Sequence, residues 1–410
     1  MIFILAWILV SSSVFLSAFY MSVYSEKKGG DMRQEFEAPD SWPSVSILVP
    51  AYNEEKVVRE SLQNLLNIDY NDLKVIFIND ASTDSTLEKA KQFEDHDGLE
   101  IIDLKHNKGK AGALNAGLEK ADTKYTVVQD ADSLMGSGLL QETVSRMEAE
   151  ENTGGVIARI APLEKDTFVR KLQVVEYMMT NFYRNLLSTV DLLDVTPGAF
   201  SIYRTQDLKD VDGFDVGNLT EDLDMAWRLR KKGRSIRMHY GTKSRTELPS
   251  NFRDLKGQRV RWARGFLYNV RKHSGMFLSK KYGLFSRFHV PMQFLVGIIS
   301  VLGLGLIGYG LFDSLYNFYI TVTSVGLRFS LPQINLMEAV LSFQWKVYTP
   351  LILGFSLIGY LIREGYRESG RNLDHPHTLG FYFFAFFFLQ AYFWSTALFK
   401  ELFRSTKAWT

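Results

Sequence analysis

Short apolar runs alternate with helical patterns through the middle of the chain, and this alternation limits the fold more than any other feature. The runs expected to be strands are 45–49, 73–79, 99–104 and 125–129, and the expected helices between them are 54–66, 85–93 and 110–120. Strand–helix–strand alternation at this spacing is typical of a parallel sheet covered by helices on both faces. The sequence therefore predicts an α/β domain, which we place at 42–250.

The composition excludes several classes of protein. The 410 residues include 47 Lys and Arg against 46 Asp and Glu, a formal net charge of +1, so charge gives no argument for nucleic-acid binding and we expect none. The absence of cysteine excludes a disulfide framework and a cysteine nucleophile. A dinucleotide site would need Gly-x-Gly-x-x-Gly after the first strand, where Tyr52-Asn53-Glu54-Glu55 stands instead.

The N-terminal end of the chain is much more apolar than its middle. Residues 2–23 contain no charged side chain, and at about 1.5 Å per residue this run is long enough to cross a bilayer. No basic region precedes it, which favours a transmembrane helix at 1–24 over a cleaved signal peptide. Lys27, Lys28 and Arg33 follow, and by the positive-inside rule they place the next domain in the cytoplasm.

The C-terminal end contains three further apolar segments, at 290–312, 348–362 and 379–399. They predict about three transmembrane helices within 288–400, although the distribution of basic residues around them leaves the count open. Two amphipathic segments, at about 166–187 and 251–285, mix aromatic and basic residues. Such helices commonly lie in the membrane interface, and the alternative is that each packs on the α/β domain. We therefore expect a multi-pass protein of the plasma membrane.

Acidic residues follow several of the expected strands. Tyr52 and Glu54 follow the first strand, Asp80 the second, and Asp130 and Asp132 the fourth. Ligands bind beyond the carboxyl ends of the strands in an open parallel sheet, so we expect these side chains at one edge. An Asp-x-Asp pair in extended chain directs both carboxylates to one face. This arrangement suits Mg²⁺ or Mn²⁺, which share their coordination shell between carboxylates and a diphosphate.

Two further motifs stand at expected helix starts. Lys110 opens the helix after the third strand, where free N–H groups and the helix dipole favour anions, although an ordinary solvated lysine is the alternative. Thr220 is typical of an N-cap, with Glu221 and Asp222 in the first turn, where the dipole stabilises acids. Local sequence alone assigns these two acids no function.

One motif precedes the C-terminal apolar region. Gln258, Arg261 and Trp262 offer an amide, a guanidinium group and an indole within five residues. Arginine pairs with phosphate and tryptophan stacks on sugar rings, but a basic, aromatic interfacial helix explains the motif equally well.

Taken in order, these motifs resemble the family 2 glycosyltransferases with a GT-A fold. The resemblance is greatest to the membrane-embedded synthases of poly-N-acetylglucosamine, chitin oligosaccharides, hyaluronan and cellulose. It rests on Pro50-Ala51-Tyr52-Asn53-Glu54, Asp80, Gly109-Lys110 with Ala113-Leu114-Asn115, Asp130-Ala131-Asp132, Thr220-Glu221-Asp222 and Gln258-x-x-Arg261-Trp262. The resemblance implies a Rossmann-like GT-A domain in the cytoplasm, with amphipathic interface helices and flanking transmembrane helices.

The resemblance also implies roles for these residues on the donor side. Tyr52, Glu54 and Asp80 would bind the uracil and ribose of a UDP-sugar, and Lys110 would lie near the nucleotide. Asp130 and Asp132 would hold the diphosphate through Mg²⁺ or Mn²⁺.

On the acceptor side, Asp222 would be the general base that deprotonates the acceptor hydroxyl. Gln258, Arg261 and Trp262 would close over the diphosphate and position the acceptor sugar. Gly198 falls where the family has a glycine-containing acceptor loop, but Thr196-Pro197-Gly198-Ala199 departs from the usual form of that loop. The identity of the acceptor therefore stays open.

The activity implied is the inverting transfer of N-acetylglucosamine or glucose to a growing β-linked polysaccharide, coupled to its secretion. An accessory membrane or export subunit would be a further partner. The alternative is a non-processive enzyme that adds one sugar to a lipid acceptor, because ceramide-type glucosyltransferases also resemble the Gln/Arg-x-x-Arg-Trp pattern. A non-catalytic scaffold of the same fold is a third hypothesis, which the intact acids disfavour.

Overall fold

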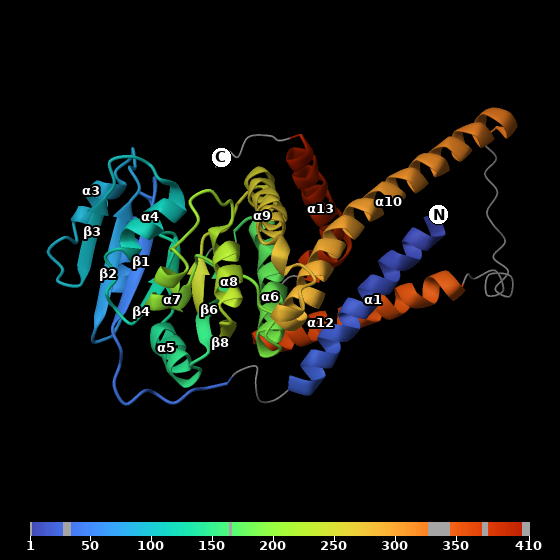
Figure 1. Cartoon of the computed structure of the whole chain (residues 1–410). Helices are drawn as coiled ribbons and strands as arrows, with labels where there is room; N and C mark the ends of the chain where they lie inside the picture. The colour runs from blue at the N-terminus through green and yellow to red at the C-terminus, as the bar shows by residue number, and fades with distance from the viewer. Residues whose placement is uncertain (1, 28–33, 164–165, 327–344, 371–375, 404–410) are drawn as a thin grey trace.

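The computed structural model describes residues 2–27, 34–163, 166–326, 345–370 and 376–403. An α/β domain built around one sheet lies beside a group of long helices that come from both ends of the chain (Figure 1). The α/β domain predicted from the alternating pattern is therefore confirmed.

The first half of the sheet follows the predicted alternation closely. Its elements are β1 (Val45–Ala51), α2 (Val58–Leu66), β2 (Leu73–Asn79), α3 (Thr86–Lys91), β3 (Leu99–Asp103), α4 (Gly109–Leu118) and β4 (Tyr125–Val128). The four strands are parallel, in the spatial order β3-β2-β1-β4. Most residues of β1 and β2 are buried on both faces, as expected where helices cover both sides of a parallel sheet.

The second half of the sheet is mixed, which the prediction of a parallel sheet missed. Beyond β4 the order is β7 (Ser201–Arg204), β6 (Thr153–Pro162), β8 (Ser235–Thr246) and β5 (Ser133–Met135). Strand β7 runs antiparallel to both β4 and β6, and β5 runs antiparallel to β8. Asp130 and Asp132 lie in the turn between β4 and β5 rather than in extended chain, so the assumed alternation of side chains does not apply to them.

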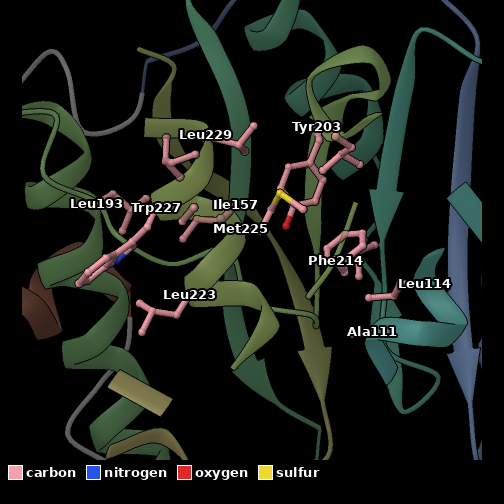
Figure 2. Close-up of a cluster of buried hydrophobic side chains, with 14 of the residues drawn as sticks. Ala111, Leu114, Ile157, Leu193, Tyr203, Phe214, Leu223, Met225, Trp227 and Leu229 are labelled. Atoms are coloured by element: carbon pink, nitrogen blue, oxygen red, sulfur yellow. The ribbon is translucent and has the colours of Figure 1, made fainter. Parts of the chain in front are cut away.

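Two buried hydrophobic clusters cover the two faces of the sheet. Helix α5 (Leu139–Ala149) contributes to one, together with Phe77 and Phe200. Helix α8 (Glu221–Lys231) contributes Trp227 to the other, where it lies near α4 and the short helix α7 (Thr205–Asp210). Figure 2 shows side chains of α8 facing residues of α4, β6 and β7 across this second cluster. This packing fixes the N-terminus of α8, which carries Asp222.

The long helices are α1 (Ile2–Lys27), α6 (Phe168–Thr189), α9 (Phe252–Lys272), α10 (Val290–Val325), α12 (Trp345–Ser369) and α13 (Pro376–Leu402). Helix α6 packs on β6 and β8 and also contacts α1, α12 and α13. Helix α6 therefore joins the sheet to the long helices. Of the two expectations for this amphipathic segment, packing on the α/β domain holds for one side of the helix. The hydroxyl of Tyr24 donates a 2.7 Å hydrogen bond to Glu364 Oε2 and links α1 to α12.

Among the residues that the structure describes, one helix is long and apolar enough to cross a membrane, at residues 285–324. A second candidate is the pair 377–383 and 385–402, which is bent by 47° at its break. The segments expected to cross at 2–23, 290–312, 348–362 and 379–399 all lie in helices. A multi-pass arrangement nevertheless stays a prediction.

Candidate active site

The carboxyl ends of β1 and β2 bring Tyr52 and Asp80 to one edge of the sheet, as expected. The amide of Asp80 donates to the carbonyl of Ala51 over 2.9 Å. The Asp80 carboxylate is buried and accepts the backbone N–H of Lys108 over 2.6 Å. Asp80 therefore fixes the loop that leads into α4. Tyr52 is 47% exposed, which leaves its ring available to a ligand.

The loops after β1 and β2 hold each other through their side chains. Asn53 and Ala81 both have φ of 58°, a left-handed conformation that is uncommon outside glycine. Asn53 Oδ1 accepts the N–H of Thr83 over 2.8 Å, and the N–H of Asn53 donates to Ser82 Oγ over 3.0 Å. These bonds link the two loops beside Tyr52 and Glu54.

The carboxylates of Glu54, Asp130 and Asp132 lie near one another at the end of β4. Burial and the carboxylates of Asp132 and Asp130 raise the pKa of Glu54 to about 7. Burial and Asp130 likewise raise the pKa of Asp132, although its oxygen accepts hydrogen bonds from Ser133 Oγ (3.1 Å) and Thr246 Oγ1 (3.2 Å). A cation placed here would relieve the repulsion among these acids.

Asp130 and Asp132 fit the divalent cation that the motif implies. No group of three or more His, Cys, Asp or Glu side chains able to hold a metal occurs among the described residues. Magnesium-type sites commonly use only one or two carboxylates and take their other ligands from water and substrate phosphates. Burial and the neighbouring Asp130 carboxylate raise the pKa of Asp132, and a bound cation would stabilise its ionised form.

Lys110 connects this acidic edge to the start of α8. Its Nζ lies 2.5 Å from Asp130 Oδ1 and 3.4 Å from Glu221 Oε1. Burial lowers the pKa of Lys110, but these carboxylates outweigh burial and the net pKa is raised. The lysine predicted near the nucleotide is therefore an ion-paired residue between the two acidic motifs, rather than a solvated one.

Gly198 makes this arrangement possible. The amide of Asp130 donates to the carbonyl of Gly198 over 2.8 Å, so the 196–199 loop runs directly over the Lys110–Asp130 pair. A Cβ atom at position 198 would overlap Lys110 Nζ and lie 2.6 Å from Asp130 Oδ1. An alanine here would therefore have to displace the ends of the Lys110 and Asp130 side chains.

Asp222 lies in the first turn of α8, beside the same loop. Its backbone carbonyl accepts the hydroxyl of Thr196 over 2.8 Å, and its Oδ1 accepts the N–H of Leu223 over 2.8 Å. Burial and the neighbouring Glu221 carboxylate raise the pKa of Asp222 to about 6. A carboxylate with such a pKa is suited to take a proton near neutral pH.

Thr220 occupies the N-cap position of α8, but its side chain makes no capping hydrogen bond to the helix. The hydroxyl instead accepts from Asn269 Nδ2 over 3.0 Å and packs against Gly265 of α9. Thr220 therefore occupies the predicted N-cap position but does not make the capping hydrogen bond expected of it. The contact with α9 outweighs the local cap and holds α8 against α9.

A cavity of about 430 Å³ opens from Asp222 toward the long helices. Helices α6, α9, α10 and α13 supply much of its wall, including Glu176 and Arg184, Arg259 and Trp262, Gln293, and Gln390 and Trp394. The general-base candidate thus faces a space large enough for sugar units, bounded by the helices that carry the apolar segments.

Helix α9 distributes its predicted motif over two cavities. Trp262 lines the cavity that contains Asp222, whereas Gln258 and Arg261 line a separate space of about 920 Å³. Arg261 donates to the carbonyl of Leu219 over 3.2 Å, two residues before Glu221. The charge of Arg261 nevertheless acts on Asp222, whose pKa it lowers, and Arg259 contacts both Gln258 and Trp262.

Two residues that the sequence analysis did not select hold this site together. Arg259 makes a buried, two-pronged ion pair with Glu176 of α6, at 2.9 and 2.7 Å, and its guanidinium lies 4.1 Å from the centre of the Trp262 ring. The available signals were an arginine inside the Gln-x-x-Arg-Trp motif and an acid on the apolar side of the amphipathic segment. Neither signal identifies the partner, because 83 residues separate them.

A further missed residue is Arg184 of α6, which lines the same cavity as Asp222. Its guanidinium makes no hydrogen bond or ion pair within the part of the chain that the structure describes. Sequence reasoning treated it only as a basic residue on an amphipathic helix.

Comparison with known proteins agrees with this geometry. Residues 46–212 match the family model described as glycosyl transferase family 2. Residues 46–212 are therefore similar to the family 2 glycosyltransferases, and the predicted resemblance is confirmed.

Among characterised proteins, the chain is 28% identical over 222 residues to a poly-beta-1,6-N-acetyl-D-glucosamine synthase of Staphylococcus epidermidis. It is 26% identical over 227 residues to the enzyme of the same name from Staphylococcus aureus. These matches cover 54% and 55% of this chain and the same shares of the two relatives. The chain thus spans about half the length of the curated relatives it matches.

Among solved structures, a mannosyltransferase from Pyrobaculum calidifontis, in complex with GDP-Man and Mn²⁺, matches with a TM-score of 0.63. The match covers 99% of this chain and 100% of that one at 18% identity. At this identity the likeness establishes the fold alone. It extends over the long helices as well as the α/β domain.

Proposed function

We propose that this chain is an inverting glycosyltransferase that moves a sugar from a UDP-sugar to a growing β-linked polysaccharide. N-acetylglucosamine is the first candidate for the sugar and glucose the second, because the relatives that match over 222 and 227 residues are named poly-beta-1,6-N-acetyl-D-glucosamine synthases. The observation that carries the proposal is the bridge made by Lys110, which places the acidic edge beside Glu221 and Asp222.

On the donor side, exposed Tyr52 would stack on the uracil, and Glu54 and Asp80 would bind the base and ribose. Asp130 and Asp132 would hold Mg²⁺ or Mn²⁺, which when bound supplies positive charge to the leaving diphosphate. Lys110 would contact the same nucleotide from the start of α4. Arg261, whose charge lowers the pKa of Asp222, would contact the diphosphate from α9.

On the acceptor side, Asp222 would act as the general base. The acceptor hydroxyl attacks the anomeric carbon, its proton passes to the Asp222 carboxylate, and the bond between the anomeric carbon and the UDP oxygen breaks. A single displacement inverts the configuration, so a UDP-α-sugar gives a β-linkage without a covalent enzyme intermediate. A positioned base of this kind contributes typically about 10²–10⁴-fold to the rate.

The cavity beyond Asp222 would hold the acceptor sugar. Trp262 offers a ring for stacking, and the Glu176–Arg259 ion pair keeps that ring in place. Helices α10 and α13 contribute to the wall of this cavity, so the acceptor would lie beside helices expected to cross the membrane, which supports coupling of synthesis to secretion.

The test uses protein purified in detergent with a panel of UDP-sugars and Mn²⁺ or Mg²⁺, following UDP release and the size and anomeric configuration of labelled product. A β-linked polymer from one donor is the expected result. Release of UDP with a single sugar on an added lipid would support the alternative acceptor instead. An α-linked product would contradict the inverting mechanism, and failure to bind UDP with Mn²⁺ would favour the scaffold hypothesis.

A further inference from the structure

A third cavity, of about 740 Å³, lies among the long helices, and we name it the helical groove. Four helices line it: α1, α10, α12 and α13. Side chains on its wall include Val10, Leu16, Ile299, Leu351, Phe355 and Phe387. Neither the family match over 46–212 nor the roles proposed above use this groove.

The lining of the helical groove is suited to hydrocarbon. Its residues are aliphatic, aromatic, glycine or proline apart from three serines, and none is charged. One of these, Ser300, donates its hydroxyl to the carbonyl of Val296 in its own helix, so it offers no donor to a ligand. A polysaccharide buried here would leave its hydroxyls without partners, at a cost in free energy for each. A hydrocarbon chain carries no such penalty.

The helical groove lies along the same two helices as the cavity that contains Asp222. On α10, Gln293 lines the Asp222 cavity and Val296 lines the groove, one helical turn further along. On α13, Gln390 lines the cavity and Phe387 the groove, again one turn apart. The path from the reacting position therefore runs along the same two helices.

The surroundings of the groove are those of a membrane-embedded surface. Helix α10, one wall of the groove, lies in the segment 285–324, which is long and apolar enough to cross a bilayer. Beyond the groove the helix exposes Leu311, Phe312 and Leu315 at 61–68% of their surface. An apolar surface this exposed is expected to face lipid, so a lipid has direct access to the groove.

We infer that the helical groove holds the hydrocarbon tail of a membrane-lipid acceptor whose head-group hydroxyl reaches Asp222. The inference rests on the proposed glycosyltransferase function and names the substrate class of its acceptor. In the first transfer the head-group oxygen bonds to the anomeric carbon, its proton goes to Asp222, and UDP leaves with the electrons of the broken bond. Arg184, which has no ion pair among the described residues, lines the cavity where the head group would lie.

The test compares two acceptors, the butyl and dodecyl β-glycosides of N-acetylglucosamine, with protein reconstituted in phosphatidylcholine nanodiscs, UDP-N-acetylglucosamine and Mn²⁺. The measured quantity is the ratio of kcat/KM for dodecyl over butyl acceptor. Ser13 is exposed and lines the groove, so Ser13→Phe places a ring inside it. Ser11 is also exposed on α1 but does not line the groove, which makes Ser11→Phe the matched control.

The wild-type protein and Ser11→Phe should share one ratio, and Ser13→Phe should lower it by roughly tenfold or more. A roughly tenfold change in this ratio is expected because each methylene displaced from an apolar site costs about fourfold in binding. Equal ratios in the two variants would overturn the inference. The inference would also fail if Ser13→Phe shortened the polymer made on a soluble chito-oligosaccharide primer while leaving the ratio intact, because the groove would then hold glycan.

A dodecyl glycoside with a diazirine at the end of its tail separates failure of this inference from failure of the proposed function. We expect the diazirine to label α1, α10, α12 and α13 beside the groove. Ser13→Phe should reduce this labelling, and Ser11→Phe should not. Labelling without transfer to any acceptor would contradict the glycosyltransferase proposal and leave the hydrocarbon site supported. Normal transfer with labels absent from the groove would overturn the hydrocarbon site alone.

Discussion

Lys110 Nζ lies 2.5 Å from Asp130 Oδ1, and the same ammonium reaches Glu221 Oε1 at 3.4 Å. One cation therefore neutralises acids that arrive from the end of β4 and from the start of α8. In the chemistry proposed here these are the diphosphate side and the base side of the site. Their spacing depends on a single lysine and on the glycine that lies over it.

Replacing Lys110 with methionine should raise the pKa of Asp222, because the lysine charge lowers that pKa. We expect the acid limb of the pH–rate profile to move to higher pH. We also expect kcat at pH 7 to fall by at least about tenfold, the scale of one charge-assisted hydrogen bond. Lys108→Met is the control, because that side chain is exposed and the contact with Asp80 uses the backbone. Indistinguishable profiles for the two variants would contradict this role of Lys110.

Gly198→Ala should damage the donor side of the site, because the new methyl group would overlap Lys110 Nζ and displace Asp130. We expect weaker UDP–Mn²⁺ binding by isothermal titration calorimetry, by about tenfold or more, as expected for loss of one charge-assisted contact. Gly275→Ala is the matched control, since a Cβ there would contact nothing within 4 Å. Wild-type affinity in Gly198→Ala would show that the close approach has no importance for donor binding.

The pH dependence of transfer should report Asp222. The pKa of this group is raised from 3.8 to about 6, and the base must be ionised to accept a proton. The rate with saturating substrates should therefore be constant well above pH 6 and fall about tenfold per pH unit below it. Single-turnover rates between pH 5 and 8 measure the profile. A rate that stays flat down to pH 5 would exclude Asp222 as the titrating base.

The Glu176–Arg259 pair should contribute strongly to stability while both partners are present. Their side chains are only 9% and 4% exposed, so Arg259→Met would leave a buried, uncompensated carboxylate. Breaking such a pair typically costs about 3–5 kcal/mol. Thermal unfolding should show this loss in Arg259→Met and recovery of most of it in the double variant Arg259→Met/Glu176→Leu. Equal destabilisation of the single and double variants would mean that the ion pair is not the origin of the effect.

The N-terminal half of the sheet could be predicted from sequence because each of its elements is encoded locally. Strand β2 matches its predicted bounds, and the starts of β1, β3 and β4 agree with prediction. The acidic residues after these strands meet at one edge, since parallel strands end together. The carboxylates of Glu54, Asp130 and Asp132 are near enough to raise the pKa of Glu54, as expected of acids at one edge.

The remainder depends on contacts between distant parts of the chain, which local patterns do not encode. Strand β5 pairs with β8 about a hundred residues later, and Thr220 bonds to Asn269 rather than capping its own helix. Arg184 and Glu176 acquire their importance only when α6 meets α9 and the long helices. For the same reason the helical groove, shared by four helices from both ends of the chain, had no signal in the sequence.

The central claim is that Asp222 is the base of a sugar transfer whose donor site is separate from it. Asp222→Asn keeps the shape of the side chain and removes its ability to take a proton. It should also fold at least as well as the wild type at pH 7, because the raised pKa means that the ionised carboxylate costs folding free energy there.

The most direct measurement therefore compares UDP–Mn²⁺ affinity and single-turnover sugar transfer in wild type and Asp222→Asn, with Asp210→Asn on the exposed surface as control. The proposed mechanism predicts unchanged UDP affinity in both variants and a loss of about 10²–10⁴-fold in transfer for Asp222→Asn alone. Transfer at the wild-type rate by Asp222→Asn would contradict it.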